Sequence, residues 1–181
     1  MIVFFQHVYR IFEFRVEAER QRERIRQAFA NSHYPYQLIT MEADHEKDTL
    51  ERLQIDACQG NALYYCYVHL KGITHPGDTL IADWRELMEY FLIDCWRQWR
   101  EKLERGADVV GVNLEPEPWP HYAGNFFALK NSAVKSLTPV AQLDNPEQWV
   151  GTSRRKDFVM ASMWNSEINH YTTPYPKSMY R

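Results

Sequence analysis

Large apolar side chains recur at helical spacing through residues 84–103, and this pattern constrains the fold most strongly. The positions are Trp84, Leu87, Met88, Phe91, Leu92, Cys95, Trp96, Trp99 and Leu103. Because an α-helix turns once every 3.6 residues, these side chains share one helix face. We expect a long helix with Asp83 as its N-cap and Gly106 as its terminator. Its aromatic stripe is expected to pack in a core and not to bind a cofactor.

Segments rich in β-branched and aromatic residues alternate with helical patterns along the rest of the chain. Strands are predicted at residues 2–5, 36–41, 62–70, 109–112 and 125–129, and helices at 12–30 and 47–58. Such alternation with short joints predicts an α/β fold in which helices cover both faces of a mostly parallel sheet. We expect one domain over residues 1–181. The chain beyond Pro139 is less regular, with a helical turn at 146–150, and is expected to wrap over one sheet edge.

The charge balance argues against a nucleic-acid-binding protein. The chain has 21 basic and 24 acidic side chains, a net charge of -3 and a pI near 6.2, so it has no global basic field. The arginines of the first helix alternate with glutamates, and Glu19/Arg22 and Glu23/Arg26 are spaced to pair. This run therefore predicts a solvated helix face.

The apolar segments are too short for a membrane span, and residues 1–8 are too short for a secretory signal. Three unclustered cysteines, Cys58, Cys66 and Cys95, are expected to be free thiols. These features predict a cytoplasmic protein.

Several familiar catalytic motifs are absent from the sequence. There is no phosphate-binding loop of the G-x-x-x-x-G-K-[ST] type, no dinucleotide-binding G-x-G-x-x-G, no G-x-S-x-G and no Cys-x-x-Cys. Cys66 and His69 lie three apart on a predicted strand, so their side chains point to opposite faces. The pair His45-Glu46 lacks the second histidine of a zinc-protease helix.

Three segments carry polar groups suited to a site. His69, Lys71 and Gly72 end a predicted strand, where ligands of α/β proteins bind, and they suit an anion; alternatively, Lys71 is solvated and Gly72 only turns the chain. In residues 121–125, His121 and Asn125 flank Ala123-Gly124, where a ligand can approach the backbone; alternatively, this is a bend. Glu147 is either a site carboxylate or an ordinary first-turn helix residue.

Four blocks in order resemble a family of small glycosyltransferases of the GT-A type, found in bacterial polysaccharide loci and large algal viruses. They are residues 67–72 (YVHLKG), 83–88 (DWRELM), 110–113 with 121–127 (VGVN and HYAGNFF), and 146–150 (PEQWV). The resemblance implies transfer of a sugar from a nucleotide-diphosphate donor to a hydroxyl acceptor, such as a growing glycan. It also implies the α/β fold predicted above.

The resemblance assigns roles to eight residues. The donor is expected to bind at His69, Lys71 and Gly72, and the acceptor at His121, Gly124 and Asn125. Glu147 and Asp83 are the candidate catalytic carboxylates. If the reaction inverts the anomeric centre, Glu147 is the expected base. Asp83 keeps its alternative role as a helix N-cap.

Metal dependence is an open question for this sequence. Most GT-A enzymes hold a metal through Asp-x-Asp, and the chain contains no such pair. Either Lys71 neutralises the diphosphate, or Mn²⁺ or Mg²⁺ binds through other groups such as Asp78 and His69. The second alternative is favoured because one ammonium offsets less diphosphate charge than a divalent ion.

Two other functions fit the same residues. The first is a non-catalytic module that binds a nucleotide sugar or carbohydrate, since the metal motif is missing. The second is another phosphate-handling transferase that uses Lys71 with Arg154-Arg155-Lys156.

Overall fold

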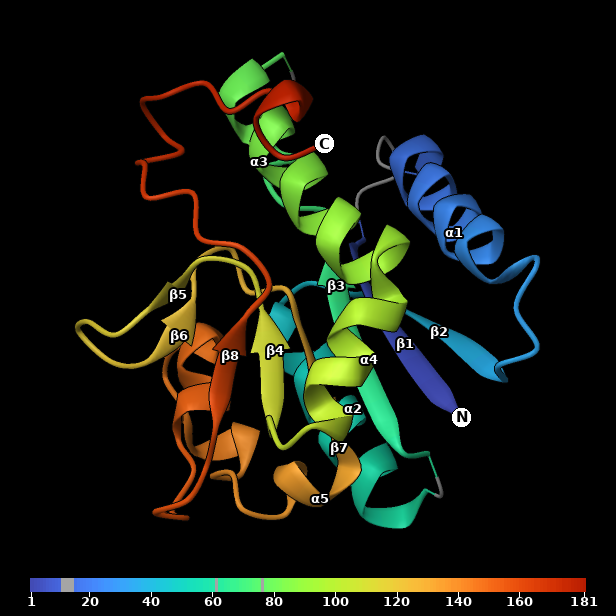
Figure 1. Cartoon of the computed structure of the whole chain (residues 1–181), viewed down its shortest axis with the longest axis vertical. Coiled ribbons are helices and arrows are strands. Elements are labelled where there is room, and N and C mark those ends of the chain that lie inside the picture. Colours follow the sequence, from blue (N-terminus) through green and yellow to red (C-terminus); the bar gives the residue numbers. More distant parts are fainter. Residues whose placement is uncertain (11–14, 61, 76) are drawn as a thin grey trace.

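Six strands form one sheet in the order β2-β1-β3-β7-β4-β8 in the computed structural model, which describes residues 1–10, 15–60, 62–75 and 77–181 (Figure 1). The strands are β1 (Ile2–Tyr9), β2 (Tyr36–Ala43), β3 (Tyr64–His69), β7 (Phe127–Lys130), β4 (Val109–Gly111) and β8 (Met160–Ser162). β1 is parallel to β2 and β3, and β4 is parallel to β8, whereas β7 is antiparallel to both of its neighbours. The predicted mostly parallel α/β sheet is confirmed.

Helices cover both faces of this sheet. The α-helices are α1 (Arg15–Phe29), α2 (Glu46–Gln59), α3 (Thr79–Glu89), α4 (Trp96–Glu104) and α5 (Asn131–Val134). Figure 1 shows α4 in front of the sheet and α2 behind it. The predicted start of the first helix at residues 12–14 lies outside the described residues.

Side chains alternate between the two faces of the sheet along each strand, so that a hydrophobic core forms on each face. In β3, Cys66 and Val68 pack with the α1, α3 and α4 side, whereas Tyr65 and Tyr67 pack with the α2 and α5 side. This two-residue period follows from the pleat of a strand, which turns successive side chains to opposite faces.

The aromatic stripe of residues 84–103 is core, as predicted, because all nine of its side chains are buried. The predicted single helix is wrong, however. A π-helix, η2 (Tyr90–Asp94), separates α3 from α4, and the Cys95 N–H donates to the carbonyl of Tyr90. A wider turn frees backbone acceptors, and the Trp99 indole N–H donates to the carbonyl of Leu92 at 2.9 Å.

The predicted N-cap of this region is also wrong. α3 begins at Thr79, and Asp78 caps it by accepting from the N–H groups of Leu80 and Ile81 at 3.0 and 3.2 Å. Asp83 lies inside the helix. At the other end, α4 stops at Glu104, and Gly106 follows with a φ of 123°, which favours glycine.

The carboxyl-terminal third contains more regular structure than predicted. Residues 160–162 form the edge strand β8, which was not predicted because three residues are too few for a periodic signal. Before it, residues 116–120 join β5 (Leu114–Glu115) to β6 (His121–Tyr122) in a two-stranded hairpin. The turns η3 (Val140–Gln142), η4 (Pro146–Gly151) and η5 (Lys177–Met179) are 3₁₀ helices. The tail folds back on α3, where Lys177 contacts Glu86 at 3.0 Å.

Other surface expectations can be compared with the structure. The ion pairs Glu19–Arg22 and Glu23–Arg26 form at 2.8 and 3.3 Å. All three cysteines are free thiols, as predicted. No helix in the described part of the chain is both long and apolar enough to cross a membrane.

Candidate functional site

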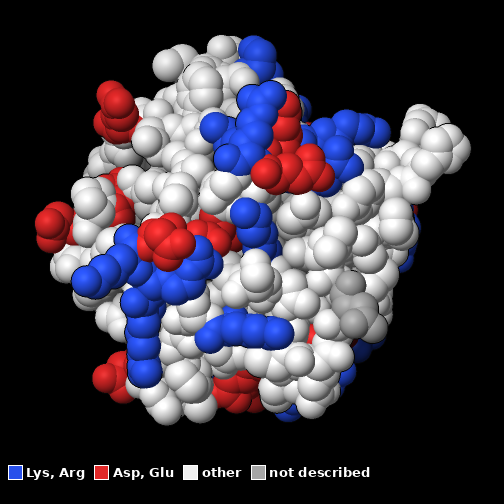
Figure 2. Space-filling model, turned by 60° about the horizontal axis from the view of Figure 1, so that its bottom comes forward, with Lys and Arg blue, Asp and Glu red and all other residues white. Residues whose placement is uncertain are grey.

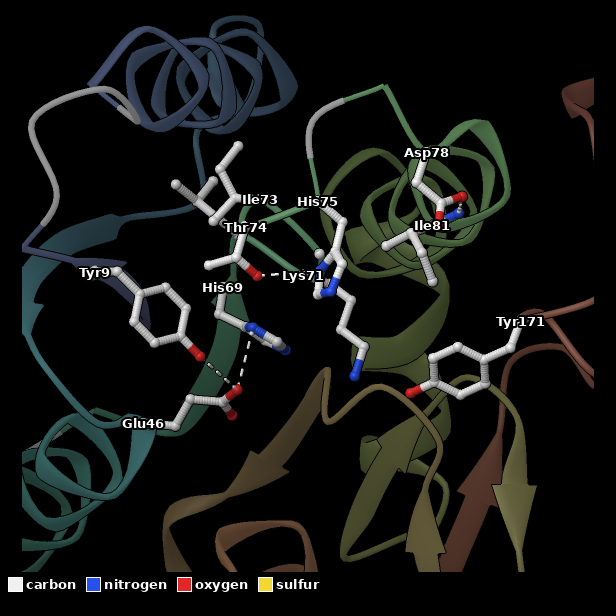
Figure 3. A pocket seen from close by; sticks show the side chains of 12 residues that line it. Tyr9, Glu46, His69, Lys71, Ile73, Thr74, His75, Asp78, Ile81 and Tyr171 are labelled. Atoms are coloured by element: carbon white, nitrogen blue, oxygen red, sulfur yellow. Dashed lines mark hydrogen bonds and ion pairs between the residues drawn. The ribbon is translucent and has the colours of Figure 1, made fainter.

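A cavity of about 350 Å³ lies beside the carboxyl ends of β1 and β3 (Figure 3). Tyr9 is the last residue of β1, His69 is the last residue of β3, and Glu46 is the first residue of α2. The loop after β3, residues 70–75, forms another wall. Because these parallel strands end at the same edge, their last side chains meet there, which is where ligands of α/β proteins bind.

Glu46 places a carboxylate in the cavity wall, with its side chain 17% exposed. Its Oε2 accepts from the Tyr67 hydroxyl at 3.2 Å and from the Asn125 amide at 2.9 Å. Its Oε1 lies 3.4 Å from both the Tyr9 hydroxyl and Nδ1 of His69. Burial raises the pKa of Glu46, but His69 and the Asn125 hydrogen bond outweigh burial and leave this pKa below its usual range. The group is therefore an anion at neutral pH.

His69 is fixed in one orientation behind this carboxylate. Its Nε2 lies 2.8 Å from the carbonyl oxygen of Gly124, which can only accept, so Nε2 carries the hydrogen. Burial lowers the pKa of His69, although Glu46 opposes that shift. Nδ1, on the other side of the ring, faces Oε1 of Glu46.

His7 lies opposite His69 in the β1–β3 register and is fully buried. Its Nδ1 is 2.8 Å from the hydroxyl of Thr49, while its Nε2 has no hydrogen-bond partner in the described part of the chain. Burial and the neighbouring His69 lower the pKa of His7 to about 4. His7 is therefore neutral under ordinary conditions.

Lys71 supplies positive charge to the cavity. Its ammonium Nζ lies 4.0 Å from a Glu147 carboxylate oxygen and 4.8 Å from the centroid of the Trp84 ring. Figure 3 shows this ammonium and the Tyr171 hydroxyl directed toward the same space. The next residue, Gly72, has a φ of +70°, and a Cβ there would lie 1.8 Å from the side chain of Ile81. Only glycine fits this position.

The tail supports Lys71 through Trp84. The His170 ring stacks on Trp84 with centroids 5.1 Å apart and an interplanar angle of 6°. His170 Nε2 lies 3.0 Å from Nδ2 of Asn113 and 2.8 Å from Oγ of Ser166. Burial lowers the pKa of His170 to about 4. The neighbouring Tyr171 lines the cavity.

Three of the eight predicted site residues line the cavity, and three others contact residues of its lining. They are His69, Lys71 and Gly72 in the lining, and Gly124, Asn125 and Glu147 in contact with it. The other two lie elsewhere among the described residues. Asp83 is within α3, and Nδ1 of His121, in the β5–β6 hairpin, contacts the carbonyl of Trp119 at 2.8 Å. Neither lines the cavity.

Comparison with protein families gives one match. Residues 11–174 match the family described as "Domain of unknown function (DUF8361)". The chain belongs to this family. No curated protein and no solved structure gives a significant match. The DUF8361 region includes every cavity residue named above except Tyr9, which precedes it.

Glu46 is the main site residue of this DUF8361 chain that sequence reasoning missed. In the sequence, Glu46 stands out only in the pair His45-Glu46, as part of an incomplete zinc-protease motif. A usable signal was present, because the first turn of a helix that follows a parallel strand lies at the same sheet edge as the ends of the neighbouring strands. Tyr9 and Tyr67 were missed for another reason: as strand aromatics they are indistinguishable from core residues in the sequence.

The groups suggested for a metal ion do not fit one. Within residues 1–10, 15–60, 62–75 and 77–181, no three His, Cys, Asp or Glu side chains are grouped so that they could hold a metal. Asp78 Oδ1 caps α3, and Nε2 of His69 carries a hydrogen directed at Gly124. The geometry does not favour this pair as ligands, which leaves the other alternative, in which Lys71 neutralises the diphosphate.

The basic segment 154–156 is separate from the cavity. Arg155 pairs with Asp108 at 3.0 Å and with Asp157 at 3.1 Å. Asp108 precedes β4, which runs in the same direction as β3. This cluster therefore lies at the amino-terminal ends of the strands, whereas the cavity lies at their carboxyl ends. On the face shown in Figure 2, acidic side chains likewise lie among the basic ones. A joint site of Lys71 with Arg154–Lys156 is not formed.

Proposed function

We propose that this protein is a glycosyltransferase that moves a sugar from a nucleotide-diphosphate donor to a hydroxyl acceptor, such as a growing glycan. One observation carries the proposal: the four sequence blocks that resemble GT-A glycosyltransferases meet around His69 and Lys71. Lys71 from the first block contacts Trp84 of the second and Glu147 of the fourth. His69 contacts Gly124 of the third. These blocks are distant in sequence, so their meeting at one cavity supports a shared role.

Lys71 binds the donor diphosphate in this proposal. As the bond between the sugar and the diphosphate breaks, the leaving group gains negative charge, and a fixed cation stabilises it. The Lys71 side chain is only 18% exposed, and Trp84 holds it at the cavity. Glu147 compensates its charge weakly, because their closest atoms are 4.0 Å apart. An incoming diphosphate can therefore compete for the ammonium.

Glu147 is the proposed base if the reaction inverts the anomeric centre. Its carboxylate takes the proton of the acceptor hydroxyl, the hydroxyl oxygen bonds to the sugar, and the bond electrons leave with the diphosphate. Glu147 is 35% exposed beside the cavity, whereas Glu46 is largely enclosed by donors. Incoming acceptor can therefore reach Glu147 more readily.

The remaining predicted residues take modified roles. The polar groups of Gly124 and Asn125 are already bonded to His69 and Glu46, so we assign them a positioning role in place of acceptor binding. Asp83 and His121 lie away from the cavity lining and have no part in the proposal.

A panel of nucleotide-diphosphate sugars tests this function. We expect at least one member to raise the melting temperature of the protein, since a ligand that binds only the folded state stabilises it. The same member should be hydrolysed slowly without an acceptor. Binding without any hydrolysis would instead favour the non-catalytic module, and no binding by any member would contradict both.

We also propose a cytoplasmic location. The free thiols at Cys58, Cys66 and Cys95 fit a reducing compartment. Fractionation of cells that express the tagged full-length chain checks this, and recovery in a secreted or envelope fraction would contradict it.

A further inference from the structure

The cavity carries opposite charges on two walls. Tyr9, Glu46 and His69 form one wall, which we call the Glu46 wall. The loop after β3 forms the other, and its Lys71 is the only Lys or Arg among the described residues that line the cavity. The second carboxylate of the lining, Asp78, caps α3. Figure 3 shows the Glu46 wall facing the Lys71 ammonium across the open space. A ligand that fits both walls has a negative end and an end that donates hydrogen bonds.

The Glu46 wall keeps unused acceptor capacity. The Tyr67 and Asn125 bonds to Oε2 are 3.2 and 2.9 Å, but both contacts of Oε1 are 3.4 Å, longer than a strong hydrogen bond. Nδ1 of His69, which lies 3.4 Å from Oε1, is buried without a hydrogen-bond partner in the described part of the chain. A donor group of a ligand can therefore improve the bonding of Oε1.

Uncharged groups supply the hydrogen bonds to the Glu46 carboxylate. The hydroxyls of Tyr9 and Tyr67 and the amide of Asn125 stabilise a carboxylate without cancelling its charge. In a largely enclosed cavity, a second carboxylate placed beside Glu46 would be repelled strongly. Hydroxyl groups would be attracted.

We infer that the Glu46 wall binds the hydroxyls of the donor sugar and selects neutral sugars over uronic acids, while Lys71 binds the attached phosphate. This inference rests on the proposed glycosyl transfer and deepens it by naming the sugar class. The cavity volume of about 350 Å³ is near the lower end for ligand pockets, which suits one sugar-phosphate unit. Sugar 1-phosphates can therefore probe the site without knowledge of the nucleotide base.

Calorimetric titration with matched sugar 1-phosphates tests the inference on the wild-type protein. The pairs are glucose with glucuronic acid and galactose with galacturonic acid, which differ only at C6. We expect at least one neutral member to bind at least about tenfold more tightly than its uronic partner. Equal affinity within both pairs, or no binding of any of the four, would overturn the inference.

Glu46→Gln removes the charge and keeps the shape. We expect it to reduce the preference for the neutral member to less than about threefold. Glu51→Gln, on the same helix but outside the cavity lining, is the matched control and should leave the preference unchanged. An unchanged preference in folded Glu46→Gln would overturn the inference. If that variant does not fold, the wild-type titrations still decide.

The two levels of the proposal fail differently. If the neutral preference is found but no nucleotide sugar is bound or hydrolysed, the proposed transferase is wrong and the polyol-binding wall stands. If a nucleotide sugar is hydrolysed and uronic and neutral donors react equally, the transferase stands and the selection by Glu46 is wrong.

Discussion

Two buried glutamates at opposite faces of the same sheet show how differently a carboxylate can be used. Glu89, the last residue of α3, has a side chain with no exposed surface and accepts from Arg20 at 3.0 Å and from Arg24 at 2.8 Å. Glu46 reaches a cavity and is held by hydroxyls and an amide. The charge of Glu89 is cancelled within the fold, whereas that of Glu46 is left for a ligand.

The two networks meet at one strand end. Gln21 donates to Glu89 at 2.8 Å and to the carbonyl of His69 at 3.2 Å, while the ring of His69 contacts Glu46. Glu89 therefore helps to hold the end of β3 in place through Gln21, whereas Glu46 faces the cavity. Variants of each should affect different measurements.

Glu89→Ala gives one of the two largest expected effects. It removes the fully buried carboxylate that Arg20 and Arg24 share. Because both arginines keep other ion pairs, with Glu17, Glu86 and Asp94, we expect a loss of about 3 kcal/mol of unfolding free energy, the lower end for a broken buried pair. Urea unfolding measures this loss. At temperatures where the variant is folded, ligand affinity should be unchanged, and a selective loss of affinity would break the distinction between the two glutamates.

Trp96→Ala gives a comparable loss without removing a charge. Trp96 is 2% exposed, stacks on Phe29 at 4.4 Å and donates to the carbonyl of Ala28. Truncating a large aromatic in a core costs about 3 to 5 kcal/mol, measured as a lower urea midpoint. A small change would mean that this helix face is not core in solution.

The pH dependence of stability should come from buried histidines in a defined window. The pKa of His7 and of His170 is about 4 in the folded protein and 6.5 in the unfolded chain. The unfolded state therefore binds more protons below pH 6.5, so stability is complete above that pH and falls as the pH drops. We expect each histidine to account for about 2 kcal/mol between pH 7.5 and 5.

Urea unfolding at a series of pH values tests this dependence. The lowered pKa values of Glu46 and Glu86 act below about 4.5, outside the window. His7→Gln should flatten the slope by the contribution of one histidine. Equal slopes in the variant and the wild-type protein would show that His7 is not held neutral.

Local patterns predicted most of the fold, because strand and helix periodicities report burial directly. The stripe at residues 84–103 was correctly predicted as core, yet the π-helix after Glu89 was not, since one extra residue in a turn barely changes the apolar spacing. β8 was missed because an edge strand of three residues is defined by its pairing with β4. Asp83 was predicted as the cap because the apolar stripe begins at Trp84, whereas the helix begins more than one turn earlier, after Asp78.

The candidate site was predictable only in part. Lys71 and Gly72 could be predicted because they directly follow an apolar strand. Glu46 depends on β1, β3 and the turn between β6 and β7, which meet it only in the folded chain. Such convergence is a property of topology, and a single sequence read locally does not contain it.

Lys71→Ala should change stability least of these variants and should affect donor binding specifically. Lys71→Ala removes a partly buried cation whose loss leaves the core intact, so unfolding free energy should change by less than about 1 kcal/mol. Loss of one charge-assisted contact to a diphosphate corresponds to a roughly tenfold to hundredfold weaker affinity. Lys102→Ala, on the exposed side of α4, is the matched control.

The most direct test is the dissociation constant of the best nucleotide sugar, measured by calorimetry in excess chelator for the wild-type protein and both lysine variants. We predict that the wild type binds without a metal, that Lys102→Ala binds equally well, and that folded Lys71→Ala binds at least about tenfold more weakly. Equal affinity of Lys71→Ala and the wild type would contradict the account, as would binding that disappears with the chelator and returns with manganese.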